Sequence, residues 1–202
     1  MRDLMSGPRR FVELQRVLPG ISTEQLRSRL NRMVADGMLT RKRYREVPPR
    51  VDYEMTERAR ELAPVLGELA HWGYEWAWGP PRPSESIDIG AIFRLVPGLV
   101  RSDSSATGTL ELAVDDGRDG TPAVYQVKFA PGRATISEGA DGTDDARVSG
   151  TRDAWIAALG PAGERGGLQT TGNQHLVTAL LDLLSQGQDS AALAVTADTA
   201  GD

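Results

Sequence analysis

Guanidinium groups are the most distinctive chemistry in this chain, and they are concentrated near its start. Residues 1–50 carry 12 Arg or Lys against 5 Asp or Glu, a net charge of +7, whereas the whole chain of 202 residues carries −5. A guanidinium group binds phosphate oxygens, or the edge of a guanine base, through paired hydrogen bonds. The composition therefore predicts an anionic partner for the front of the chain, with nucleic acid as the first candidate.

Other site chemistries find little support in the sequence. The chain has no cysteine, and its two histidines, His71 and His175, are too few for a histidine zinc site. The segment DDGRDG, from Asp115, places Gln126 where a calcium loop needs a glutamate. No apolar run approaches the roughly 20 residues that cross a bilayer, and no signal-peptide pattern is present. We assign no catalytic residue, metal or cofactor, and expect a cytoplasmic protein that is not an enzyme and does not enter a membrane.

Two short helices around a tight turn are predicted to carry the first of these cations. Apolar side chains recur at helical spacing over residues 11–18, and the segment PGIS ends that helix. Ser22 and Gln25 form a capping box for a second helix, which the glycine of Asp36-Gly37 ends. Its outward polar face can read base edges, although a solvated helix face is the plain alternative. The candidate residues of this face are Thr23, Gln25, Arg27, Ser28, Arg29 and Arg32.

A basic hairpin is predicted to follow the second helix. Residues 38–44 and 51–55 form its strands, and the REVPPR connection stays out of the ladder because of its prolines. Cations on such a wing bind phosphates and add affinity without reading sequence. Two arginines near the start of the first helix can do the same. The predicted phosphate-binding residues are Arg9, Arg10, Arg41, Lys42, Arg43, Arg45 and Arg50.

These segments in combination resemble a known family. The G-x-x-R-F-x-E-L opening, the GIS turn, PPRV-x-Y in the hairpin and a T-x-x-x-x-E-L-x-P-V-L helix closing in WG resemble the HxlR-type winged helix-turn-helix transcriptional regulators of bacteria, over residues 1–79. The resemblance implies a regulator that binds double-stranded DNA as a homodimer. Relatives begin with a helix of which residues 1–5 supply only the stump, so we expect the native start to lie upstream of Met1 or the chain to be truncated.

A longer helix is predicted from Thr56, with Pro64 bending it or setting off its first turn. The aromatic-rich segment HWGYEWAW, residues 71–78, follows, and we expect it to lie in the core, in a dimer interface or in an inter-domain contact. Residues 80–87, rich in proline and serine, are predicted to be a linker. One stripe of the helix carries apolar side chains at Leu62, Val65, Leu66, Leu69 and Trp72.

Residues 88–185 are predicted to form an α+β domain with an antiparallel sheet covered by helices. Residues 83–202 carry 8 Arg or Lys against 17 Asp or Glu, a net charge of −9, and from Ile87 the pattern changes to short strands. Apolar and polar side chains alternate over residues 108–139, which predicts an antiparallel meander with one buried face. The segments ARVSGTRDAWIAALG and LQTTGNQHLVTALLDLL each predict a short strand and then a helix. Residues 186–202 are small and polar, and we expect disorder there.

This order of elements is similar to the sterol-carrier-protein type-two-like fold. The resemblance implies that apolar molecules bind between the sheet and its helices. We therefore expect a bacterial DNA-binding regulator whose C-terminal domain senses an apolar small molecule. The alternative is a lipid or small-molecule carrier whose winged helix makes protein contacts only. The candidate lining residues, which can equally be plain core, are Phe93, Leu112, Tyr125, Val127, Phe129, Ile136, Trp155, Leu159, Leu176 and Leu180.

Overall fold

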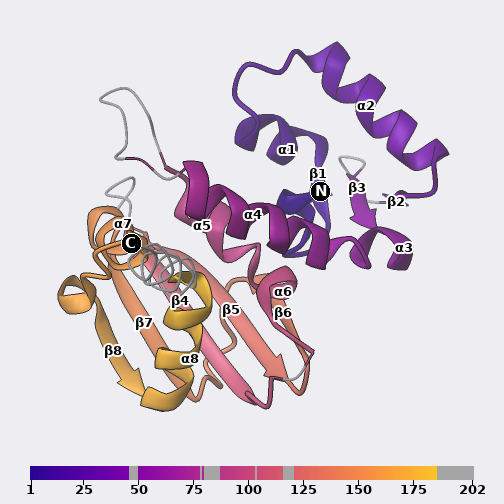
Figure 1. The fold of residues 1–202 in the computed structure, drawn as a ribbon. Coiled ribbons are helices and arrows are strands. Elements are labelled where there is room, and N and C mark those ends of the chain that lie inside the picture. The colour runs from indigo at the N-terminus through magenta and orange to yellow at the C-terminus, as the bar shows by residue number, and fades with distance from the viewer. Residues whose placement is uncertain (46–49, 78, 80–86, 103, 116–120, 186–202) are drawn as a thin grey trace, which may run out of the picture.

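The computed structural model describes residues 1–45, 50–77, 79, 87–102, 104–115 and 121–185 (Figure 1). The predicted tail, residues 186–202, and the predicted linker, apart from Ile87, lie outside these residues. The N-terminal elements are η1 (Arg2–Leu4), β1 (Arg9–Arg10), α1 (Phe11–Val17), α2 (Thr23–Ala35), β2 (Leu39–Tyr44), β3 (Arg50–Met55), α3 (Glu57–Arg60) and α4 (Ala63–Ala77).

The helix-turn-helix forms as the sequence predicts. The Ser22 hydroxyl accepts a hydrogen bond from the Gln25 N–H at 3.2 Å, and Gln25 Oε1 accepts one from the Ser22 N–H at 3.2 Å, so the capping box starts α2. Gly37 follows α2 with a φ of +69°, and the Met38 N–H bonds to the Met33 carbonyl at 2.9 Å. The inward side chains form one core: Leu4, Leu14, Leu26, Leu30, Leu39, Tyr53, Met55 and Ala59.

The wing is a three-stranded sheet in the order β1-β3-β2. Strands β2 and β3 pair antiparallel from Leu39 opposite Met55 to Tyr44 opposite Arg50, which confirms the predicted hairpin. Residues 46–49 of its connection lie outside the described part of the chain. Strand β1 adds Arg9 opposite Tyr53 on the free side of β3. The sequence did not predict β1, because two residues are too few to show an alternating pattern.

Helix α4 connects the winged helix-turn-helix to the rest of the molecule and runs between the two parts (Figure 1). The Thr56 hydroxyl caps α3, accepting from the Ala59 N–H at 3.3 Å, and Pro64 lies in the first turn of α4. Pro64 therefore does separate a first turn from the main helix, as predicted. Farther along, α4 crosses α6 with direct backbone contact, since a Cβ on Gly67 would lie 2.1 Å from the Gly98 carbonyl oxygen.

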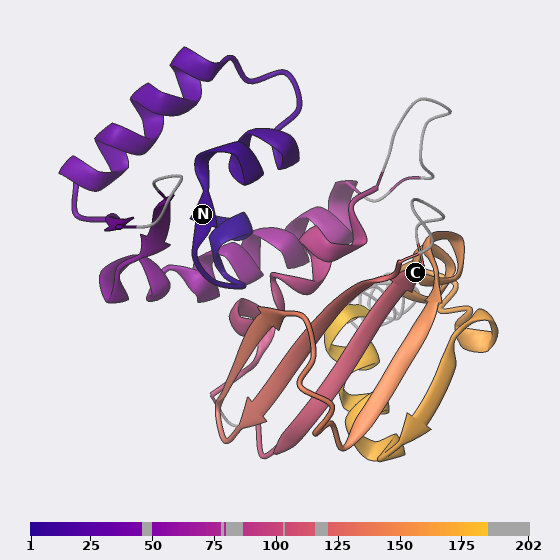
Figure 2. The same ribbon diagram turned by 180° about the vertical axis from the view of Figure 1, so that it is seen from behind.

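The C-terminal domain has a five-stranded sheet in the order β6-β5-β4-β7-β8. Figure 1 shows α7 and α8 over one face of the sheet, and Figure 2 shows the opposite face from behind. The apolar side chains of the first face pack in one core with those of the helices. The elements are α5 (Ile89–Phe93), α6 (Val96–Leu99), β4 (Gly108–Asp115), β5 (Ala123–Ala130), β6 (Arg133–Glu138), β7 (Ala146–Thr151), α7 (Arg152–Leu159), η2 (Arg165–Gly167), β8 (Gln169–Gly172) and α8 (Gln174–Ser185).

The structure corrects two predictions for this domain. The sheet is mixed, not purely antiparallel, because β7 runs parallel to β4 although the β4-β5-β6 meander is antiparallel as predicted. Residues 139–145 return the chain to the starting end of β4, where Asp145 exchanges two 2.8 Å hydrogen bonds with the Thr109 backbone. The segment after Ile87 also begins with helices α5 and α6, not strands, because the Asp88 side chain caps α5 by accepting from the Ala91 N–H at 3.1 Å.

A partly buried ionic cluster joins the two parts of the molecule. Arg94 of the C-terminal domain is only 4% exposed, and its Nη2 lies 2.9 Å from Glu138 Oε1 and 3.1 Å from the Tyr125 hydroxyl. Glu138 also pairs with Arg9 of the wing, whose Nε donates to the Asp3 carbonyl at 2.5 Å. Burial raises the pKa of the Tyr125 phenol, with Glu138 adding to the shift and Arg94 opposing it. The cluster therefore fixes β1 against β6.

Candidate nucleic-acid interface

The outward face of α2 is polar and exposed over its whole length. Thr23, Gln25, Arg27, Ser28, Arg29 and Arg32 are all exposed, whereas Leu26 and Leu30 of the same helix are buried. Helix α2 lies on the side of the winged helix-turn-helix away from the C-terminal sheet (Figures 1 and 2). The helix can therefore enter a groove without the C-terminal domain of the same chain in its way.

Several side chains of this face also have partners within the protein. Gln25 takes part in the capping box, and the Thr23 hydroxyl accepts a hydrogen bond from Gln15 Nε2 at 2.9 Å, which ties α2 to α1. Arg27 pairs with Glu24 at 3.1 Å and Arg32 with Asp36 at 3.7 Å, both exposed pairs within one helix. Such pairs contribute only about 0.3–0.5 kcal/mol, so they exchange readily for a phosphate.

The wing meets α2 in a shared groove. A hollow of about 230 Å³ is lined by Arg27 and Asn31 from α2 and by Arg41 from β2, with Phe11, Val51 and Tyr53 as its apolar floor. Arg43 lies two residues beyond Arg41 on the same strand and so shares its face. Among the described residues, neither Arg41 nor Arg43 makes an ion pair. Two elements thus direct guanidinium groups toward one region, and the exposed side chain of Asn31 adds an amide.

The other wing residues divide into exposed cations and structural ones. Arg10 and Arg45 are exposed. Lys42 points to the opposite side of the strand, where its Nζ lies 2.5 Å from Glu54 Oε2; this hydrogen bond and ion pair raise the pKa of Lys42. Arg50 is held by both oxygens of Asp52, at 2.7–2.9 Å, and stacks over the Tyr44 ring at 5.2 Å.

The prediction that Arg9 binds phosphate needs correction. Its side chain is buried, with 8% of the residue exposed, and is bound to Asp3 and Glu138. A guanidinium held by these internal partners is not presented to a duplex. Arg50 likewise has a partner within the protein, the almost completely buried Asp52. The hydrogen bonds from Arg50 lower the pKa of Asp52. We therefore assign Arg9 to holding the wing in place, whereas Arg50, whose side chain is 38% exposed, stays a predicted phosphate contact that also pairs with Asp52.

Comparison with known proteins supports the winged helix-turn-helix assignment. The HxlR-like helix-turn-helix family matches residues 1–79. The HTH-type transcriptional regulator YvaP of Bacillus subtilis (strain 168) is 37% identical over 74 residues, which cover 37% of this chain and 68% of YvaP. The chain belongs to the HxlR-like helix-turn-helix family.

Further relatives of this HxlR-like chain show the same extent of similarity. The HTH-type transcriptional regulator YkvN of the same organism is 43% identical over 74 residues, covering 37% of this chain and 63% of YkvN. The solved structure of the reduced transcriptional regulator YodB from B. subtilis is 32% identical and covers 37% of this chain and 72% of that one, with a TM-score of 0.35. The chain spans between 53% and 68% of the length of eight curated relatives that it matches. These relatives are transcriptional regulators, which are not enzymes, as the sequence led us to expect.

The predicted ligand-lining residues lie beyond the HxlR-like segment, and the structure places them in the core of the C-terminal domain. All ten belong to one cluster of buried side chains: Phe93, Leu112, Tyr125, Val127, Phe129, Ile136, Trp155, Leu159, Leu176 and Leu180. The Phe93 ring packs edge-on against Trp155 at 4.7 Å and against Tyr125 at 5.6 Å, and Trp155 Nε1 donates to the Ala113 carbonyl at 3.0 Å. Packing of this kind matches the plain-core alternative for most of these side chains, but Leu159 also lines a cavity under α4 and Ile136 lines a second cavity beside β6.

Two further properties concern the described part of this HxlR-like chain. None of its helices combines the length and the apolar character needed to cross a membrane. No three side chains of His, Cys, Asp or Glu in that part are placed together to hold a metal ion.

Proposed function

We propose that this chain is a bacterial transcriptional regulator that acts in the cytoplasm and binds double-stranded DNA through α2 and the wing. The observation that carries the proposal is the shared groove, in which Arg27 and Asn31 of one element meet Arg41 of another. Arginine and asparagine side chains on a helix can bond to guanine and adenine edges in the major groove, which is wide enough for one α-helix. The wing then lies across the adjoining phosphates.

Within this proposal the cations have different tasks. Arg29 and Arg32 lie with Gln25 and Ser28 on the outward face of α2, where they can contact base edges and the phosphates beside them. Arg43 and Arg45 of the wing bind phosphates and add affinity that falls with salt. Membership of the HxlR-like family supports this arrangement, because its named relatives are transcriptional regulators.

We also propose that the protein is a homodimer formed through α4. One face of α4 carries large apolar side chains that are exposed in the described part of the chain, including Trp72 and Trp76, which are 58% and 70% exposed. Apolar stripes of this kind on a helix mark interaction sites in soluble proteins. A second α4 is the partner that fits, because a twofold axis lets the stripe cover itself. The stripe consists of Val65, Leu69, Trp72 and Trp76 of α4, together with Leu62 just before the helix.

The C-terminal domain, in this proposal, is a sterol-carrier-like sensor of an apolar small molecule. Support comes from its layers, a sheet whose helices all pack on one apolar face, and from its attachment to α4 through the Gly67 and Gly98 crossing. A ligand that favours one position of α4 would also favour one arrangement of the dimer.

Selection of bound fragments from genomic DNA, with the full chain at a stated and moderate salt concentration, tests the proposal. We expect enrichment of an inverted repeat with half-sites about 10 base pairs apart, one helical turn, because a twofold dimer presents two α2 helices. Absence of any enriched fragment, together with retention of lipids by the same preparation, would instead favour a carrier whose winged helix contacts proteins.

A further inference from the structure

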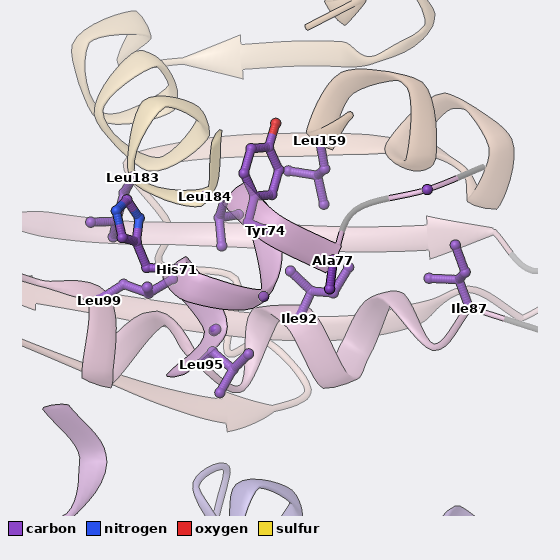
Figure 3. Close-up of a pocket in the computed structure, with 13 residues that line it drawn as sticks. His71, Tyr74, Ala77, Ile87, Ile92, Leu95, Leu99, Leu159, Leu183 and Leu184 are labelled. Atoms are coloured by element: carbon purple, nitrogen blue, oxygen red, sulfur yellow. The ribbon is translucent and has the colours of Figure 1, made fainter. Parts of the chain in front are cut away.

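A cavity of about 280 Å³ lies between α4 and the C-terminal domain. Figure 3 shows its lining, in which His71, Tyr74 and Ala77 of α4 face Leu159 of α7 and Leu184 of α8. Side chains of α5 and α6 and of Leu95 between them, together with Ile87 and Leu183, complete the described wall. The cavity is therefore bounded by the helix that carries the proposed dimer stripe and by helices of the proposed sensor domain.

The volume restricts what can occupy this cavity. An engineered protein cavity of roughly 150 Å³ accommodates benzene, so 280 Å³ suits a molecule of about ten to twelve non-hydrogen atoms. A helix of a partner protein, about 10–12 Å across, does not fit into such a space. The volume therefore suits a small molecule and not a helix of another protein.

The lining chemistry restricts the occupant further. Ile92, Leu95 and Leu99 supply apolar surface opposite α4, and no Asp, Glu, Lys or Arg occurs among the described lining residues. A charged ligand would lose its hydration there without gaining a counter-ion. His71 and Tyr74 carry the polar groups of the lining side chains, a ring nitrogen and a hydroxyl that can each hydrogen-bond to a ligand.

We propose that this cavity is the effector site and that it binds neutral, compact aromatic or alicyclic molecules carrying one hydrogen-bonding group. The inference rests on the proposed sensor function and moves the ligand from the sheet core, where the sequence placed it, to the underside of α4. The same helix then holds the ligand on one face and the second protomer on another, which gives the ligand a direct route to the dimer.

Direct titration of the full chain with 2-naphthol, followed by naphthol fluorescence and by calorimetry, tests the site. Naphthalene-2-sulfonate has the same ring system with a charge, and we expect it to bind at least about 10-fold more weakly. The variant Gly73→Leu should weaken 2-naphthol binding by at least about 10-fold, because Gly73 lines the cavity and a Cβ there meets no atom within 4 Å. Glu75→Leu places the same side chain on an exposed position of α4 outside the lining and should change binding by less than about twofold.

A second variant and a separate readout keep the result unambiguous. If Gly73→Leu does not fold, Ala70→Leu fills the same cavity from one turn earlier on α4 and carries the same expectation. Lack of 2-naphthol binding, equal binding of the sulfonate, or equal losses in Gly73→Leu and Glu75→Leu would each overturn the site. DNA binding is measured on the same preparations, so a protein that binds 2-naphthol but no DNA refutes the proposed function and not the cavity.

Discussion

Replacement of Trp72 by alanine is expected to dissociate the proposed dimer while leaving the protomer folded. Trp72 is 58% exposed, so its side chain contributes little to the stability of a single chain. A tryptophan buries up to about 250 Å², and the exposed share of Trp72 is then about 145 Å² that a second protomer can cover. At about 25 cal/mol per Å², that area is worth roughly 3–4 kcal/mol for each copy, an upper bound because alanine retains part of it.

A twofold dimer loses this contact twice, and the dimer Kd of Trp72→Ala should rise by at least about 100-fold. Sedimentation velocity over a range of protein concentrations measures the change directly. Glu75→Ala is the matched control, since Glu75 is an exposed polar residue of the same helix and should leave Kd within about twofold. A wild-type protein that stays monomeric at high concentration, or a Trp72→Ala variant with unchanged Kd and unchanged DNA binding, would refute the assignment of α4 as the dimer helix.

Two further predictions concern charged groups inside the protein. Arg94→Ala should lower the free energy of unfolding by about 1–3 kcal/mol in urea titrations, because it removes the buried guanidinium that bonds to Glu138 and to the Tyr125 hydroxyl, while Glu138 is 47% exposed and keeps its pair with Arg9. Arg165→Ala, which breaks the more exposed pair with Asp182, should cost less than about 1 kcal/mol, and similar losses in the two variants would contradict a special role for the Arg94 cluster. The lowered pKa of Asp52 means that its pair with Arg50 contributes stability above the unfolded carboxyl value, about 3.9, and loses it as the pH falls through the lower folded value. The gap in unfolding free energy between wild type and Asp52→Asn should therefore be full at neutral pH and shrink below about pH 4, and a gap that widens on acidification would be inconsistent with this pair.

The sequence was sufficient to predict features that depend only on neighbouring residues, such as helix caps and helix breaks. Ser22 and Thr56 cap the helices that they precede, and Pro64 separates α3 from α4, since each effect needs only a few adjacent residues. The alternating pattern of residues 108–139 likewise suffices for an antiparallel meander, because each strand pairs with the next along the chain.

Features that depend on residues far apart in the chain could not be predicted from the sequence. Arg9 is one cation in a basic segment, but its partner Glu138 lies 129 residues away, so nothing nearby indicated burial. The parallel pairing of β7 with β4 depends on the sheet edge to which the chain returns. The periodicity of a strand does not indicate which edge that is. The stripe on α4 was visible as a periodicity, but periodicity alone does not say whether a core or a second chain covers it.

The cavity under α4 was not predictable for the same reason. Its described walls come from five helices, α4 to α8, whose packing cannot be read from the sequence, and its lining residues have the composition of an ordinary core. The predicted ligand residues shared that composition, which is why they were assigned to a site that the structure shows to be filled by side chains.

The most direct test is the salt dependence of binding to a duplex taken from the genomic selection. Arg41→Ala with Arg43→Ala removes two wing cations from each protomer of the proposed dimer, and Arg147→Ala with Arg165→Ala removes two from the C-terminal domain as the control. Each lost phosphate contact lowers the slope of log K against log salt by about 0.9, so the wing variant should lose about 3–4 units of slope and the control almost none. Equal slopes and affinities for wild type and both variants, or no binding of the wild type to any duplex, would contradict docking of this surface on DNA.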